Sequence, residues 1–210
     1  MSTDAGLLTL TQWLSPAFPL GSFAYSHGLE TAMQAGQVHD PSSLEAWLNA
    51  LIRHGSGRID AVLLVQAMRG TEGVASLARS LAASRERLEE TEAQGRAFVS
   101  TVNTLTGAED EPAPLPVAVG RAAARLHLAE DTVAALYLQS FAANLAACAT
   151  RFLPLGQTQG QGVVSRLAPA ILDTAQAACS ASLDEIGTAA LGADLAAMVH
   201  ETLEVRIFKT

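Results

Sequence analysis

The side chains best suited to chemistry fall in two short stretches of the sequence. Residues 15–30 (S-P-A-F-P-L-G-S-F-A-Y-S-H-G-L-E) contain His27 and Glu30, and His200 is followed directly by Glu201. A histidine beside a carboxylate suits general acid–base catalysis, so one hypothesis is a small helical hydrolase or lyase that uses these pairs. Adjacent residues on a helix point about 100° apart, however, so His200 and Glu201 would not face one substrate atom. The enzyme hypothesis therefore stays an alternative.

Motifs for metal or nucleotide binding are absent from the sequence. Residues 200–204 (H-E-T-L-E) begin like the zinc motif H-E-x-x-H but lack its second histidine. No histidine pairs with another histidine or a cysteine at metal-ligand spacing. A P-loop needs a Gly-Lys pair, and the only lysine, Lys209, follows Phe208. We expect neither a cofactor nor a stable metal site.

The composition indicates a folded, acidic protein. Of the 210 residues, 49% are hydrophobic and 16% are charged, which excludes a disordered chain. The net charge is −8, and no basic face for nucleic acid is visible. Cys148 and Cys179 lie far apart and no signal peptide is recognisable, so we expect a cytoplasmic protein with reduced thiols. No run of about 18 uncharged apolar residues occurs, so we expect no membrane span.

Hydrophobic residues recur at helical spacing through nearly the whole chain, and convincing alternating strands are missing. The clearest stripe consists of Val133, Tyr137, Phe141, Leu145, Cys148 and Phe152, and the last consists of Leu195, Val199 and Leu203. The pattern predicts an all-α fold, a single-domain helical bundle of roughly eight to ten helices over residues 1–210.

Turn and cap residues divide this helical pattern. Asp40 directly precedes a proline, which predicts a helix that begins there. Residues 107–116 are acidic and proline-rich, so we expect a solvated loop between two halves of the bundle. Residues 204–210 follow the last helical pattern, and we expect this tail to be flexible. Glycines stand where helices should end, at Gly36, Gly107 and Gly156.

Residues 15–30 are better explained by shape than by catalysis. Pro16 and Pro19 forbid a continuous helix, and Gly21 can turn the chain. Ser22 or Ser26 can cap the helix that follows. The neighbouring aromatic residues either anchor a partner or pack the turn into the core, and the sequence leaves both options open. These aromatic residues are Phe18, Phe23 and Tyr25.

Two further features favour close packing or partner contacts. Gly95 lies inside a helical run, which indicates either close helix approach or a tolerated glycine. Residues 151–161 carry Arg151, Gln157 and Gln161 around a Pro-Leu-Gly turn. Glutamine amides donate and accept hydrogen bonds without charge, so they suit a polar seam or a partner contact.

The sequence contains three distinctive stretches, in this order: residues 15–30, Pro154-Leu155-Gly156-Gln157 with Gln161, and His200-Glu201-Thr202 with Arg206-Ile207-Phe208-Lys209-Thr210. Taken together, they resemble the UreF family of urease accessory proteins. The chain departs from the family pattern at Ser22, at Leu203-Glu204 and at Lys209.

The resemblance implies an all-helical, non-catalytic homodimer. Proteins of this family join UreD (also called UreH) and the GTPase UreG on apo-urease, and this complex delivers nickel. The resemblance also implies modulation of the GTPase and a tail that becomes ordered on UreD. The residues we expect to contact partners are Tyr25, Ser26, His27 and Glu30, then Arg151, Gln157 and Gln161, and finally His200, Glu201, Arg206 and Phe208.

Overall fold

The computed structural model describes residues 3–210, and over this range the chain contains helices and no strand. The all-α fold is therefore confirmed. The α-helices are α1 (Thr3–Trp13), α2 (Leu29–Gln34), α3 (Pro41–His54), α4 (Ser56–Met68), α5 (Val74–Ser80), α6 (Arg85–Thr106), α7 (Leu115–Ala123), α8 (Glu130–Phe152), α9 (Gln157–Arg166), α10 (Ala168–Ser180) and α11 (Leu191–His200). Three 3-10 helices add η1 (Ser22–Ala24), η2 (Ala124–Leu126) and η3 (Leu183–Glu185).

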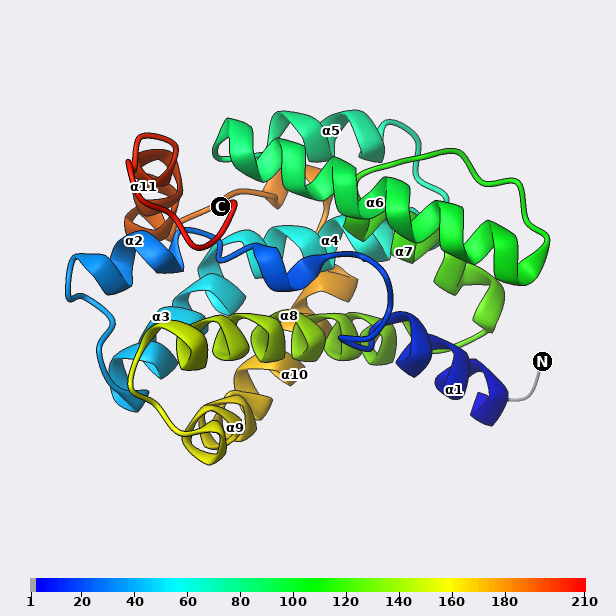
Figure 1. Cartoon of the computed structure of the whole chain (residues 1–210). Coiled ribbons are helices and arrows are strands. Elements are labelled where there is room, and N and C mark those ends of the chain that lie inside the picture. Colours follow the sequence, from blue (N-terminus) through cyan, green and yellow to red (C-terminus); the bar gives the residue numbers. More distant parts are fainter. Residues whose placement is uncertain (1–2) are drawn as a thin grey trace.

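Helices α4 and α8 form the centre of the bundle. Nearly every residue of α4 is buried, because α3, α7, α8 and α10 all pack against it. Helix α8 runs along the molecule with α9 and α10 on one side, while α5 and α6 cover the opposite side (Figure 1). Helix α11 and the tail lie at one end, next to α2 (Figure 1). Segments from the beginning and end of the sequence therefore meet at this end.

Close helix packing explains Gly95, which the sequence left open. A Cβ atom added to Gly95 would lie 1.8 Å from the backbone oxygen of Ala113. The loop before α7 therefore crosses α6 at a point where no side chain fits. Gly120 has the same role between α7 and α4, since its added Cβ atom would lie 2.3 Å from the Leu64 oxygen.

The helix ends follow the sequence pattern at most positions. Asp40 caps α3, and its side chain accepts a hydrogen bond from the backbone N–H of Ser43 at 2.8 Å. Gly107 ends α6 with a left-handed φ of 72°, and Gly36 follows α2 with a φ of 70°. Residues 107–114 form a loop before α7, two residues shorter than the expected 107–116 because the helix begins at Leu115.

Gly156 is a correction to the sequence analysis, because it precedes a helix instead of ending one. Helix α8 ends at Phe152, and Leu153 is already extended with φ −95° and ψ 156°. Leu153 precedes Pro154, and the proline ring disfavours the helical conformation in the residue before it. The proline therefore ends α8, and Gly156 is the N-cap of α9.

Helix α8 is long and apolar enough to span a membrane, although the sequence analysis expected no such segment. Within residues 3–210 it is the one helix that is long and apolar enough to do so by length and composition. In the most apolar 18-residue part of α8, 50% is buried inside the bundle. The central helix of a helical bundle passes the same test, and Val133, Leu138 and Leu145 of α8 belong to the core.

Candidate interaction site at the C-terminal tail

The turn at residues 15–30 has an unusual backbone conformation directly before α2. His27 and Gly28 both adopt left-handed conformations, with φ values of 54° and 75°. A Cβ atom on Gly28 would lie 2.7 Å from the backbone nitrogen of Ala197, so α11 packs directly on this turn. Of the aromatic residues in the turn, Phe18 is buried against Phe98, whereas Phe23 is 66% exposed. The turn thus uses one ring for the core and leaves another at the surface.

Glu30 is fully buried and binds the tail through its carboxylate. The backbone N–H groups of Ile207 and Phe208 donate to its two oxygens at 2.8 and 2.9 Å. The Nε2 atom of His200 lies 3.1 Å from the same carboxylate. A buried carboxylate needs such donors because it has lost its hydration. Glu30 therefore joins α2, α11 and the tail.

His200 is equally buried and lies between two carboxylates. Its Nδ1 atom is 2.7 Å from an oxygen of Glu86, opposite the contact of Nε2 with Glu30. The two ring nitrogens of His200 therefore each face a carboxylate, on opposite sides of the ring. Glu86 also pairs with the guanidinium of Arg206 in the tail. The cluster links α6, α11 and the tail through opposite charges.

A second buried cluster lies deeper in the bundle. Burial by itself raises the pKa of Glu90, but Arg87 and His27 beside it prevail and lower that pKa to about 2. Burial also raises the pKa of Asp60, although the guanidinium of Arg87 opposes this effect. Burial beside the Asp60 carboxylate raises the pKa of the Tyr137 hydroxyl well above its ordinary value, and this hydroxyl donates to Asp60 at 2.9 Å. Glu90 is therefore an ionised carboxylate at neutral pH.

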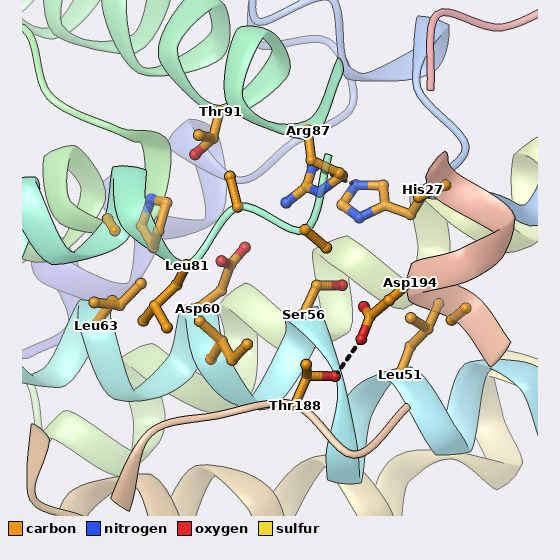
Figure 2. Close-up of a pocket in the computed structure, with 17 residues that line it drawn as sticks. His27, Leu51, Ser56, Asp60, Leu63, Leu81, Arg87, Thr91, Thr188 and Asp194 are labelled. Atoms are coloured by element: carbon orange, nitrogen blue, oxygen red, sulfur yellow. Dashed lines mark hydrogen bonds between the residues drawn. The ribbon is translucent and has the colours of Figure 1, made fainter. Parts of the chain in front are cut away.

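Small cavities adjoin this second cluster. One has a volume of about 50 Å³ and is lined by His27, Ser56, Asp60 and Arg87, which converge on it in Figure 2. Within residues 3–210, His27 Nδ1 and Ser56 Oγ have no hydrogen-bond partner. A polar cavity of this size holds water in other proteins. Over the same range, no group of three histidine, cysteine or acidic residues is arranged to hold a metal ion.

The tail is packed against the bundle, in contrast to the expected flexible segment. Phe208 and Thr210 are only 4% and 1% exposed. The physical reason is that Glu30 accepts the backbone hydrogen bonds of the tail, and Phe208 reaches the hydrophobic core. Val205 and Ile207 point the other way and are 77% and 65% exposed.

Arg151 connects the first and the last of the three stretches that carry the family resemblance. Its guanidinium lies over the ring of Phe208, 4.8 Å from the ring centre, and donates to the backbone oxygen of Phe23. It also donates to the sulfur of Cys148 at 3.1 Å. A cation over an aromatic face is attractive because the face carries negative charge. One side chain at the end of α8 thus contacts both the first stretch and the tail.

The structure divides the residues expected to contact partners into buried and accessible groups. The buried ones hold the tail and the turn together in this structure, and their contact with partners stays a prediction: Ser26, His27, Glu30, His200 and Phe208. The accessible or half-buried ones are Tyr25, Arg151, Gln157, Gln161, Glu201 and Arg206. Among them, Glu201 accepts the backbone N–H of Arg85 at 2.7 Å and so helps to cap α6.

The sequence analysis missed the orientation of α11. The stripe of large residues predicted there faces solvent, while small residues and His200 form the buried face because Gly28 brings the turn so close. The signal was present in the alanines that recur at positions 193, 196 and 197. We call the exposed residues of α11 the α11 apolar face, and they are Leu191, Leu195, Met198 and Val199; the tail has two exposed apolar residues of its own, Val205 and Ile207.

The buried tail and the exposed apolar face are features of an all-helical interaction protein, and comparisons with known proteins identify its family. The UreF family model matches residues 38–168. The urease accessory protein UreF of Cereibacter sphaeroides (strain KD131 / KCTC 12085) is 57% identical over 209 residues, which cover 99% of this chain and 100% of that protein. The chain therefore belongs to the UreF family, as the resemblance predicted.

More distant relatives match over nearly the same length. The urease accessory protein UreF of Jannaschia sp. (strain CCS1) is 50% identical, covering 98% of this chain and 94% of that protein. The protein of the same name from Paracoccus denitrificans (strain Pd 1222) is 46% identical, covering 100% of this chain and 99% of that protein. The matched length therefore spans the segments that contain the turn, α11 and the tail.

Proposed function

We propose that this chain is a non-catalytic scaffold in urease maturation. In this proposal it joins UreD/UreH and the GTPase UreG on apo-urease, so that nickel is delivered to the urease active site. Membership of the UreF family over the full length of the chain supports the proposal, as does the name urease accessory protein that its relatives carry. We further propose that the chain works as a cytoplasmic homodimer.

The observation that carries the proposal is the α11 apolar face. Leu195 is 60% exposed, Val199 is 50% exposed, and the tail adds Val205 at 77%. Large apolar side chains that cluster on one face mark protein interaction sites, because their removal from water favours binding. We assign this face, together with the packed tail, to UreD/UreH.

A matched pair of substitutions tests this assignment. Leu195→Asp places a charge in the α11 apolar face, whereas Leu172→Asp places the same charge on α10 at an equally exposed leucine, 61% against 60%. Tagged UreD is used to capture each variant from a purified mixture. We expect Leu195→Asp to abolish capture and Leu172→Asp to leave it unchanged. Equal capture of both variants would refute the assignment.

Deletion of the tail is a second test of the same contact. A chain without residues 205–210 lacks Val205 and Ile207 as well as the anchor Phe208. We expect this deletion to weaken binding to UreD, measured by calorimetry against the complete chain. If the deleted chain binds UreD as tightly as the complete one, the tail has no part in the interface.

Modulation of the GTPase is the second activity that we propose for the scaffold. Arg151 is exposed at the surface, but its guanidinium already contacts Phe208, Phe23 and Cys148. We therefore place Arg151 in the support of the surface and do not assign it to the nucleotide. The GTP hydrolysis rate of UreG, measured with the UreD complex of the wild-type chain and of Arg151→Lys, tests this: a structural role predicts similar rates.

The structure gives no support to the alternative of a small hydrolase. His200 and Glu30 do contact each other, yet both side chains are 0% exposed, so no substrate reaches them. His27 and Glu90 form a similar buried pair at 2.9 Å. Turnover of a substrate by the purified chain, abolished by His200→Ala, would revive the enzyme hypothesis.

A further inference from the structure

The last six residues of the chain are bound in the manner of an extended peptide ligand. The N–H groups of Ile207 and Phe208 donate to Glu30, and the N–H group of Lys209 donates to the backbone oxygen of Ala24 at 2.7 Å. The oxygen of Thr210 accepts the backbone N–H of Ser26 at 3.0 Å. Main-chain pairing of this kind is how proteins recognise extended peptides.

Three side chains of the tail are anchored at alternating positions. Arg206 pairs with Glu86, Phe208 is buried under Arg151, and the Thr210 hydroxyl donates to Glu90 at 3.2 Å. The side chains between them are exposed, with Ile207 at 65%. Alternation of bound and exposed side chains is expected of an extended chain, in which successive residues point to opposite sides. The pattern that is recognised is thus Arg-x-Phe-x-Thr.

The residues that bind the tail belong to the body of the bundle. They lie in the turn at residues 24–30, in α6 and at the end of α8, whereas the tail follows α11 through a short segment at residues 201–204. Glu204 in that segment is exposed. We call the binding residues the tail groove, and they are Ala24, Ser26, Glu30, Glu86, Glu90 and Arg151.

We propose that the tail groove is a peptide-binding site in its own right, occupied here by residues 205–210 of the same chain. Its ligand class is an extended peptide with the spacing Arg-x-Phe-x-Thr, and the tail of a second copy of this chain has the same chemistry. The tail is then an exchangeable ligand, held by charge, backbone hydrogen bonds and one buried ring. This inference concerns the isolated chain and does not depend on any partner of the proposed function.

Cleavage of the segment at residues 201–204, which joins the tail to α11, tests the proposal. The cut is made after the complete chain has folded, so it does not interfere with folding. A protease recognition sequence is inserted between Leu203 and Glu204 in the complete chain, and the purified protein is cut there. Size-exclusion chromatography and mass spectrometry then report whether the released peptide stays with the body. A fluorescein-labelled synthetic peptide of residues 204–210 is added, and its anisotropy reports exchange into the groove.

Peptide variants provide the matched control. We expect the cut protein to retain the tail and to bind the labelled peptide saturably, while the uncut chain binds none because its groove is filled. Competition by a Phe208→Ala peptide should be weaker by at least about thirtyfold, as for a central interface anchor. Competition by an Ile207→Ala peptide should match that of the native peptide, because this side chain is 65% exposed.

Other results would overturn the proposal. Immediate loss of the tail after cleavage, with no saturable binding of the labelled peptide, would show that the groove has no affinity of its own. Equal competition by the two variant peptides would show that the anchors do not recognise the ligand. Equal binding to cut and uncut protein would place the peptide on another surface.

Discussion

Replacement of Glu30 by glutamine is the most informative change at the tail. The carboxylate of Glu30 accepts the backbone hydrogen bonds of Ile207 and Phe208, and it also contacts Nε2 of His200. Glutamine has almost the same shape but keeps only one acceptor oxygen, and its amide group is a donor. At least one donor of the tail or of His200 would then face another donor.

The size of the effect follows from burial. Glu30 is 0% exposed, and the N–H groups of Ile207 and Phe208 and the ring of His200 all approach its carboxylate. Hydrogen bonds to a charged group contribute about 1.5–3 kcal/mol each. Release of the tail limits this cost, because freed N–H groups bond to water, so we expect about 3 kcal/mol. For a chain of this size that corresponds to a melting temperature lower by about 6–12 °C.

Calorimetry and hydrogen exchange measure the two parts of this prediction. Glu30→Gln should lower the melting temperature and should remove the protection of the amides of residues 207–209. Glu204→Gln is the matched control, since Glu204 is exposed and adjoins the same segment. A Glu30→Gln protein with the stability and tail protection of the Glu204→Gln control would refute the assigned role of the carboxylate.

Three further expectations concern acid stability, helix packing and the buried ring. The pKa of Glu90 is lowered from 4.5 to about 2, so its ionisation contributes up to about 3 kcal/mol of stability above pH 4.5. This stability is lost as the pH falls toward 2. Urea titrations over that pH range should therefore show a smaller loss of stability for Glu90→Gln than for the wild-type chain. Gly95→Ala should lower the melting temperature measurably, whereas Gly187→Ala, where an added Cβ meets nothing within 4 Å, should not; equal melting temperatures would contradict the close approach at Ala113. Phe208→Ala should lower the free energy of unfolding by about 3–5 kcal/mol if the tail stays bound until the whole chain unfolds. The loss should be smaller if the tail detaches first, and hydrogen exchange of the tail amides distinguishes the two cases.

The helical fold could be predicted because its signals are local. The spacing along α8, the cap at Asp40 and the glycine at Gly107 each depend on a few neighbouring residues. Gly156 was misassigned because a neighbouring proline had already ended the helix. Local signals of this kind determine where helices lie, but they do not determine which helices meet.

The candidate site depended on long-range contacts, and the sequence therefore predicted it only in part. The stretches containing Glu30 and His200 were singled out, but Glu86 of α6, which contacts His200, was not. Charged residues in a helix look alike whether they face solvent or a buried cluster. The α11 face was misjudged for a related reason: the small residues that pack on Gly28 left the large ones outside.

Nickel-dependent activation of purified apo-urease tests the central proposal most directly. UreD, UreG, GTP, bicarbonate and nickel are combined with apo-urease, with the wild-type chain, with Leu195→Asp or with no chain, and urease activity and bound nickel are measured. Of the three mixtures, we expect only the one with the wild-type chain to activate urease. The mixture with Leu195→Asp should contain about as little urease-bound nickel as the mixture without the chain. Equal activation and equal nickel loading in all three mixtures would contradict the proposal that this chain is the scaffold.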